Sequence, residues 1–269
     1  MRAVEGIGLP EVRGVYDGRE GELWELIMGQ QIHVGGMQSS MELAGRAGIG
    51  AGMRGVDLCC CNGAGMRFLV RFLDVAAMVG VDASETVLAR GNARCAAEGV
   101  RDRIRFVLAD ACDTGLAAAA ADFVWGEDAW CYVADKPRLV AEAARLVKPG
   151  GVIAFTDWVE GPAGLADAEA EFFLRCMKFP NVEDIPGYAA LLAAAGCEVV
   201  AAEDTGRFAR CLDLYTDMIE LQLTYDALRI IGFDPEVMQA MATEFAGMRE
   251  LAHAGKITQA RFVARRSAA

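Results

Sequence analysis

Short apolar runs and amphipathic stretches alternate between residues 55 and 156 of the chain. Short apolar runs bounded by turn residues are typical of buried strands, and an apolar position every three or four residues is typical of helices. The pattern predicts strands at 55–60, 75–81, 104–108, 121–125 and 152–156, with helices at 65–74, 85–98 and 136–147. We therefore expect an α/β fold with a doubly wound parallel sheet, right-handed crossovers and helices on both faces.

The remaining residues have mainly helical periodicity. Residues 1–50 are expected to form loop and helix, with helices at 20–28 and 41–47. After the fifth strand come predicted helices at 166–178, 188–195, 213–231 and 235–252, with strands at 198–202 and 257–263. The chain then divides into an N-terminal helical segment (1–50), a core (51–206), a helical insertion (207–256) and a last strand with its tail (257–269).

Composition narrows the classes of partner. The 269 residues are 54% apolar, enough for a large core, and carry a net charge of −12. That charge disfavours a phosphate backbone or an anionic membrane, and no apolar run approaches the roughly 20 residues of a membrane span. The nine cysteines are an odd number without a Cys-x-x-Cys pair. We therefore expect a cytoplasmic protein without a disulfide framework, structural metal, nucleic-acid partner or membrane partner.

A tight turn of small residues, Cys59 to Gly65, separates the first predicted strand from its helix. Such a turn lets the backbone approach a ligand closely and points the first amides of the helix at it. Asp82 follows at the end of the second strand. A small-residue turn followed by an acid at the next strand end is how doubly wound proteins bind a nucleoside.

Further features follow the turn in a fixed order. After Asp82 come Ala109-Asp110-Ala111, then Asp122-Phe123-Val124-Trp125, and finally Lys148-Pro149-Gly150-Gly151 before the fifth strand. The series resembles the class I S-adenosylmethionine-dependent methyltransferases over roughly residues 50–265. The resemblance implies a Rossmann-like, mostly parallel sheet of seven strands, with S-adenosylmethionine as the cofactor.

A narrower resemblance extends into the N-terminal segment. Gly29 to Gly35, and Tyr16-Asp17 before it, are similar to the N-terminal motif of sarcosine/dimethylglycine N-methyltransferases. The segment from Trp125 to Trp130 with Asp135-Lys136, and the segment from Ala254 to Thr258, resemble further motifs of that family. This resemblance implies an amine as the methyl acceptor.

The resemblance also implies a set of cofactor-binding residues. Asp82 would accept hydrogen bonds from the ribose hydroxyls, and Asp110 from the adenine amino group beside the Ala111 amide. The family has glycine where Cys59 and Cys61 stand, so both cysteines would need a glycine-like backbone. The expected cofactor-binding residues are Asp57, Cys59, Cys61, Gly63, Gly65, Asp82, Ala83, Asp110, Ala111 and Glu127.

The acceptor is expected between the N-terminal segment and the ends of strands four and five. His33 is the first catalytic candidate, either as a general base or as a hydrogen-bonded residue that holds the N-terminal segment over the cofactor. Tyr132, the second candidate, stands where the family has histidine, and Trp158 where it has proline. The expected substrate-binding residues are Tyr16, Trp130 and Trp158, whose rings could hold an ammonium, stack on a flat acceptor or belong to the core.

Three adjacent cysteines, Cys59 to Cys61, invite comparison with thiol chemistry such as arsenite methylation. Adjacent residues on a strand point to opposite faces, which suits neither a shared metal nor an unstrained disulfide. We expect them to be small buried side chains without a chemical role.

These features predict a methyltransferase that acts on a small-molecule acceptor, with an amine as the first choice. The alternatives are methylation of carbon, oxygen, sulfur or arsenic in another metabolite, and a protein that binds the cofactor without turnover. A nucleotide-dependent oxidoreductase is disfavoured because the turn lacks the G-x-G-x-x-G spacing. The sequence leaves open a homo-oligomer and whether residues 207–256 form a lid or a dimer contact.

Overall fold

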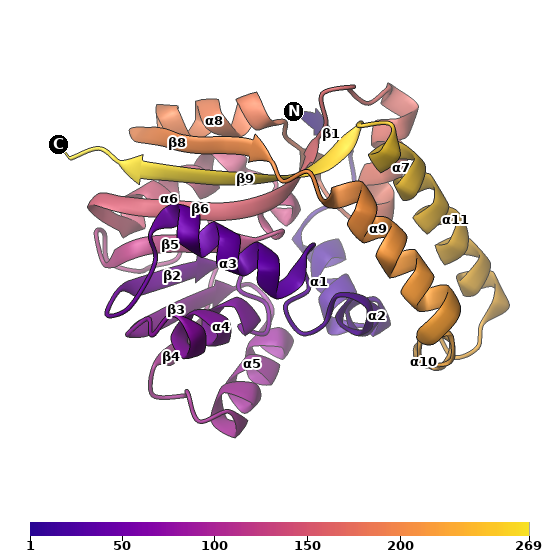
Figure 1. Ribbon diagram of the computed structural model, residues 1–269, viewed down its shortest axis with the longest axis horizontal. Coiled ribbons are helices and arrows are strands. Elements are labelled where there is room, and N and C mark those ends of the chain that lie inside the picture. The colour runs from indigo at the N-terminus through magenta and orange to yellow at the C-terminus, as the bar shows by residue number, and fades with distance from the viewer. Residues whose placement is uncertain (269) are drawn as a thin grey trace.

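The computed structural model describes residues 1–268, which contain a seven-stranded sheet in the order β4-β3-β2-β5-β6-β9-β8 (Figure 1). Five strands run parallel: β2 (Arg54–Leu58), β3 (Ala77–Asp82), β4 (Ile104–Leu108), β5 (Ala121–Glu127) and β6 (Val147–Glu160). The strand β9 (Ile257–Arg266) lies between β6 and β8 (Cys197–Asp204) and is antiparallel to both. The predicted mostly parallel, seven-stranded α/β fold is confirmed.

Helices cover both faces of the sheet. Side chains of successive strand residues point to opposite faces, so each central strand contributes to two cores. Phe123 and Trp125 of β5 pack with residues of α3 (Gly36–Ala47), α4 (Ala64–Phe72) and α5 (Glu85–Ala97). Val124 of the same strand packs with residues of α6 (Lys136–Leu146) and α8 (Ile185–Ala194) on the opposite face. In Figure 1, α3 and α4 lie in front of the sheet.

Elements from both halves of the chain pack together beyond the carboxyl ends of the parallel strands (Figure 1). The helices are α1 (Leu9–Asp17), α2 (Arg19–Met28), α7 (Asp167–Met177), α9 (Phe208–Asp217), α10 (Thr224–Ile230) and α11 (Pro235–His253). Trp24, Phe173, Leu212 and Phe245 share one buried cluster there. The short strands β1 (Arg2–Ala3) and β7 (Asn181–Val182) pair antiparallel nearby. These elements cap the end of the sheet where doubly wound folds bind ligands.

Several elements differ from the sequence prediction, and three of them show why. Residues 9–17, expected as loop, form α1, which begins with a proline in its first turn as helices often do. The strand β6 begins at Val147 rather than residue 152, because the pairing with β5 shifts register between Ala121 and Phe123. The helix expected at 213–231 is divided by a π-helical turn, η2 (Met218–Gln222). There the Thr224 hydroxyl donates to the Glu220 carbonyl at 2.9 Å and competes with the helical pattern.

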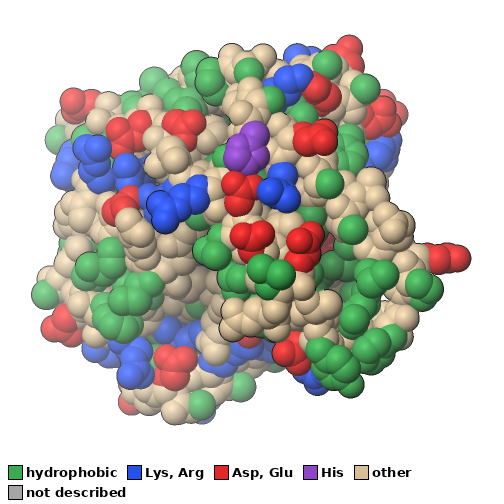
Figure 2. Space-filling view, turned by 45° about the vertical axis from the view of Figure 1, so that its right-hand side comes forward, with side chains coloured by type: hydrophobic (Ala, Val, Ile, Leu, Met, Phe, Trp, Pro, Cys, Tyr) green, Lys and Arg blue, Asp and Glu red, His purple; other side chains and the backbone are tan. Residues whose placement is uncertain are grey.

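Exposed apolar side chains gather over the helical residues between β8 and β9, toward the lower right of Figure 2. They are 41% to 83% exposed and comprise Leu214, Leu221, Tyr225, Phe233, Val237 and Met238. A lid or a dimer contact in this region stays a prediction. None of the helices within residues 1–268 combines the length and the apolar character needed to cross a membrane.

Candidate functional site

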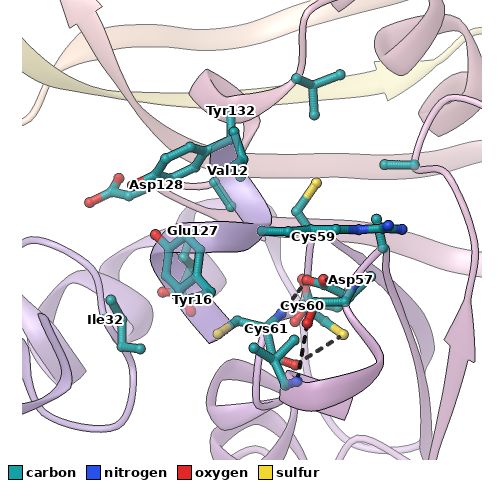
Figure 3. A pocket seen from close by; sticks show the side chains of 18 of the residues that line it. Val12, Tyr16, Ile32, Asp57, Cys59, Cys60, Cys61, Glu127, Asp128 and Tyr132 are labelled. Carbon is teal, nitrogen blue, oxygen red and sulfur yellow. Dashed lines mark hydrogen bonds between the residues drawn. The ribbon is translucent and has the colours of Figure 1, made fainter. Parts of the chain in front are cut away.

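A cavity of about 280 Å³ lies at the carboxyl ends of β2, β3, β4 and β5 (Figure 3). Its walls are the turn after β2, residues 82–84 and 110–112, and residues within 127–135. One side of α1 and the segment Gln30–Ile32 close it from the N-terminal side. Segments far apart in the sequence thus meet around one hollow.

The turn after β2 has the backbone geometry that glycine normally supplies. The φ angles are +63° at Cys59, +47° at Cys61 and +73° at Gly63. For a cysteine this left-handed conformation costs roughly 1–2 kcal/mol. Cys59, Cys61 and Gly65 line the cavity. Gly63 does not, and the structure corrects its role to packing: a Cβ there would lie 2.7 Å from the Phe106 ring.

Two aspartates at strand ends are oriented by backbone amides. Asp82 accepts from the Cys61 amide at 2.9 Å and from the Ser84 amide at 3.0 Å. Asp110 accepts from the Cys112 amide at 2.8 Å. A carboxylate offers about four lone-pair positions, so each aspartate keeps acceptor capacity for a ligand. Both line the cavity, together with Ala83 and Ala111.

Asp57 and Glu127 form a second acidic pair in the cavity wall, at the ends of β2 and β5. Glu127 accepts from the Ser40 hydroxyl at 2.6 Å and from Trp125 Nε1 at 3.1 Å. Asp57 is 5% exposed, and burial together with the neighbouring carboxylates raises its pKa well above the ordinary value. Buried carboxylates that face a cavity favour a cationic ligand.

Tyr16 and Tyr132 both line the cavity (Figure 3). Their rings meet edge to face with centroids 5.4 Å apart. Burial raises the pKa of both phenols well above the ordinary value. The two hydroxyls therefore stay protonated and can donate or accept a hydrogen bond.

Trp130 and Trp158 are absent from the cavity wall, and the structure corrects both to core residues. Trp130 is fully buried and stacks on Phe155 with ring centroids 4.0 Å apart. Trp158 is 3% exposed and packs against Phe179 and Phe208, with centroids 5.9 and 4.7 Å away. The strand β6 continues past the predicted end at residue 156, which carries Trp158 into the core under the capping helices.

The turn, Asp82, Asp110 and β5 all lie within residues 56–155, and this region matches the family model described as a methyltransferase domain. Residues 56–155 form a methyltransferase domain. This confirms the family resemblance predicted from the ordered sequence features.

One related protein is the 27-O-demethylrifamycin SV methyltransferase of Amycolatopsis mediterranei (strain S699). It is 34% identical over 171 residues, which cover 62% of this chain and 62% of that protein. The match therefore spans less than two thirds of the relative's length.

Two solved structures share the fold around the methyltransferase domain. A candidate sarcosine dimethylglycine methyltransferase from Galdieria sulphuraria has a TM-score of 0.76 and 23% identity, with 86% of each chain covered. Phosphoethanolamine N-methyltransferase 2 of Haemonchus contortus, in complex with phosphomonomethylethanolamine and S-adenosylhomocysteine, has a TM-score of 0.82. It is 21% identical and covers 95% of this chain and 58% of that chain. These likenesses confirm the Rossmann-like methyltransferase fold.

His33 lies behind the wall of the cavity, not in it. Its side chain is 1% exposed. Nε2 is 3.2 Å from the Ser40 hydroxyl and 3.3 Å from a carboxylate oxygen of Glu127. Of the two roles predicted for His33, this position favours the second. His33 is a hydrogen-bonded residue that holds the N-terminal segment against the methyltransferase domain.

We expect His33→Ala to weaken S-adenosylhomocysteine binding or to lower stability by about 1–3 kcal/mol, because Glu127 and Ser40 lose a buried partner. Turnover at saturating substrate should stay within about tenfold of the unchanged protein. Calorimetry, urea denaturation and initial rates measure the three effects, with His253→Ala, at the exposed end of α11, as the control. A loss of roughly 10²–10⁴ in kcat at unchanged affinity would instead identify His33 as a base.

Several cavity residues were missed because they come from the N-terminal segment. Val12, Gln30 and Ile32 line the cavity, and recognition of α1 as a helix would have suggested Val12.

Asn62, in the turn after β2, was also missed as a site residue. Its Nδ2 donates to the Gln30 carbonyl at 3.1 Å, while its buried Oδ1 has no hydrogen-bond partner within the described chain.

Asp128 was noted only as part of a motif. Its carboxylate accepts from the Val34 amide at 2.8 Å and from Gln259 Nε2 at 2.8 Å. Gln259 Nε2 also lies 3.0 Å from the Val34 carbonyl. Asp128 therefore ties the N-terminal segment to β5 and β9, which only the folded arrangement reveals.

The thiols of the turn are not activated. Burial, followed by the charge of Asp82, raises the pKa of Cys61 to about 12 and that of Cys59 well above its ordinary value. Because the thiolate is the nucleophilic form, both side chains stay unreactive near neutral pH.

Cys61→Gly and Cys61→Ala should both keep turnover within about tenfold, or about 1.4 kcal/mol of barrier. The glycine variant should be more stable than the alanine variant by about 1 kcal/mol, because only alanine has a Cβ that opposes a left-handed backbone. Initial rates and urea denaturation measure the two effects. Complete loss of turnover in folded protein that still binds S-adenosylhomocysteine would show that the thiol takes part in the chemistry.

Proposed function

We propose that this chain transfers a methyl group from S-adenosylmethionine to a small molecule. The observation that supports this most is the position of Asp82. Two backbone amides hold its carboxylate in a cavity bounded by the turn from Cys59 to Gly65. A carboxylate at this strand end suits a pair of ribose hydroxyls, and the turn lets backbone approach the rest of the cofactor.

The residues present fit this cofactor. The unpartnered Oδ1 of Asn62 is buried in the cavity wall and would be satisfied by a donor from a ligand. Asp57 and Glu127 suit the positive charge of a sulfonium compound. When bound, S-adenosylmethionine supplies an electrophilic methyl group. The chain's own part is alignment of the acceptor and exclusion of water, for which α1 and Gln30–Ile32 cover the cavity.

The acceptor that we propose is an amine. Glu127 brings an acidic group to the same cavity as Tyr16 and Tyr132. A phenol oxygen that accepts from an N–H would direct the nitrogen lone pair, so Tyr132 remains the proposed catalytic residue and Tyr16 a substrate-binding one. Similar solved structures include a candidate sarcosine dimethylglycine methyltransferase and a phosphoethanolamine N-methyltransferase, which supports the same choice.

A hydroxyl acceptor is the second candidate. It is supported by the 34% identity with 27-O-demethylrifamycin SV methyltransferase. The same two phenols can donate to an acceptor oxygen, so the cavity does not require nitrogen.

Calorimetry with S-adenosylhomocysteine and with NAD tests the cofactor. We expect binding of the first and none of the second, and the opposite result would overturn the proposal. An acceptor panel then compares sarcosine and dimethylglycine with quinols, phenols, thiols and arsenite by the release of S-adenosylhomocysteine. Methylation of phenols alone would select the second candidate. Cofactor binding without methylation of any acceptor would indicate a cofactor-binding protein without turnover.

A further inference from the structure

Lys136 is fully buried at the start of α6. Its Nζ donates to the Val133 carbonyl at 3.1 Å, to the Asn181 carbonyl at 3.3 Å and to the Asn181 side-chain oxygen. An ammonium group has three donors, and these three oxygens can satisfy all of them. The partners of Lys136 are thus carbonyl and amide oxygens. One of them, the Val133 carbonyl, belongs to the segment of residues 131–134 that precedes α6.

The same segment is held at two more backbone positions. Asp157 of β6 is fully buried and accepts from the Cys131 amide at 3.0 Å and from the Tyr188 hydroxyl at 2.5 Å. The Asn181 side chain of β7 donates to the Ala134 carbonyl at 2.8 Å. The backbone groups of residues 131, 133 and 134 are therefore each bound by a buried side chain from β6, β7 or α6.

This segment carries Tyr132 and forms one wall of the cavity, to which Val133 and Ala134 also contribute. Figure 3 shows Tyr132 reaching into the cavity on the side of Tyr16. Buried charged groups such as Lys136 and Asp157 are costly, and well-packed apolar side chains in their place are often as stabilising or more so. A contribution to overall stability therefore does not explain why Lys136 and Asp157 are buried here. Their hydrogen bonds to the backbone next to Tyr132 explain it directly, because they fix the position of that backbone.

We propose that Lys136, Asp157 and Asn181 are positioning residues that fix the cavity wall at residues 131–134 and so determine where Tyr132 meets the acceptor. This inference rests on the proposed function only in taking the methyl acceptor as the molecule that Tyr132 contacts. The position of the wall can be measured without cofactor or acceptor. Where methyl transfer is measurable, Lys136→Met should lower kcat/KM for the acceptor by on the order of 10- to 100-fold, because small misplacements of aligned groups slow a displacement strongly.

Fluorine NMR of the full chain labelled with 3-fluorotyrosine reads this wall directly. The chain has five tyrosines, and Tyr132→Phe assigns the resonance of Tyr132. In Lys136→Met and in Asn181→Leu that resonance should shift or broaden, while the resonance of Tyr225, a solvent-exposed residue of α10, should stay unchanged. Tyr188→Phe is the matched control, because it removes a hydrogen bond to Asp157 and leaves the three backbone contacts in place.

An unchanged Tyr132 resonance in folded Lys136→Met and Asn181→Leu overturns the proposal. Broadening of every tyrosine resonance overturns it too, since the network would then support the whole fold and not the wall. If neither Lys136→Met nor Asn181→Leu folds, the proposal is overturned for the same reason. If Lys136→Met alone fails to fold, Asn181→Leu decides. An inactive protein in every acceptor assay would count against the proposed function and leave this measurement interpretable.

Discussion

Asp82→Ala should bind S-adenosylhomocysteine about 1.5–3 kcal/mol more weakly than the unchanged protein, which corresponds to roughly 10- to 150-fold in Kd. In the proposed cofactor site this carboxylate would accept from the ribose hydroxyls, and the amides of Cys61 and Ser84 already hold it in place. A pre-oriented charged acceptor loses little freedom on binding, so its removal costs the full hydrogen bonds. Isothermal calorimetry measures the change.

Asp122→Ala is the matched control for Asp82→Ala. Asp122 also accepts from a backbone amide, that of Arg54 at 2.7 Å, but it lies at the beginning of β5, at the opposite end of the sheet. Its removal should leave the affinity for S-adenosylhomocysteine unchanged even if stability falls. Equal affinities of Asp82→Ala and the unchanged protein would place the ribose away from Asp82.

Trp158→Ala should lower the free energy of unfolding by about 3–5 kcal/mol, the usual cost of deleting a large buried aromatic side chain. The ring is 3% exposed and contacts the rings of Phe173, Phe179 and Phe208, which belong to the cluster under the capping helices. Urea denaturation measures the loss. Trp158→Phe keeps much of the ring volume and should cost distinctly less.

The two possible roles of Trp158 give opposite results. A residue of the acceptor pocket would, when replaced, lower turnover and leave the unfolding free energy nearly intact. If Trp158→Ala is as stable as the unchanged protein and loses activity, Trp158 belongs to the acceptor site after all.

The sequence was informative where backbone chemistry and strand periodicity decide the outcome. Asp82 and Asp110 each follow an apolar run, and the carboxyl ends of parallel strands meet at one end of a sheet, so their convergence could be predicted. The family resemblance also implied a glycine-like backbone at Cys59 and Cys61, and the φ angles of +63° and +47° agree with it.

The aromatic residues show where this reasoning ends. Apolar periodicity indicates that a side chain is buried, but a tryptophan packed on other rings and one facing a ligand have the same sequence pattern. The outcome for Trp158 depends on how far β6 continues, and that strand reaches Glu160 because β9 pairs with it up to Ile257. This pairing joins residues about a hundred positions apart in the sequence.

Tertiary contacts also decide the missed helix α1. Gly14 interrupts its pattern and lowers helix propensity, and Gly18 follows directly after its last residue. The helix is stabilised by what it contacts: Val15 is 3% exposed, and Asp17 accepts from the Ser84 hydroxyl at 2.6 Å. The helix α1, which covers the cavity, is thus stabilised by contacts with residues far away in the sequence. The local sequence pattern of α1 carries no information about those contacts.

The place of β9 between β6 and β8 has a consequence for how the chain folds during synthesis. Within residues 1–268 the strand β8 pairs with β9 alone, and the helical residues 208–253 are translated between the two. Until β9 has been made, one side of β6 has no hydrogen-bonding partner, and an open strand edge is a template for aggregation. Pairing across such sequence distances is also slow. We therefore expect nascent chains that stall before residue 257 to be the form of this protein most dependent on chaperones.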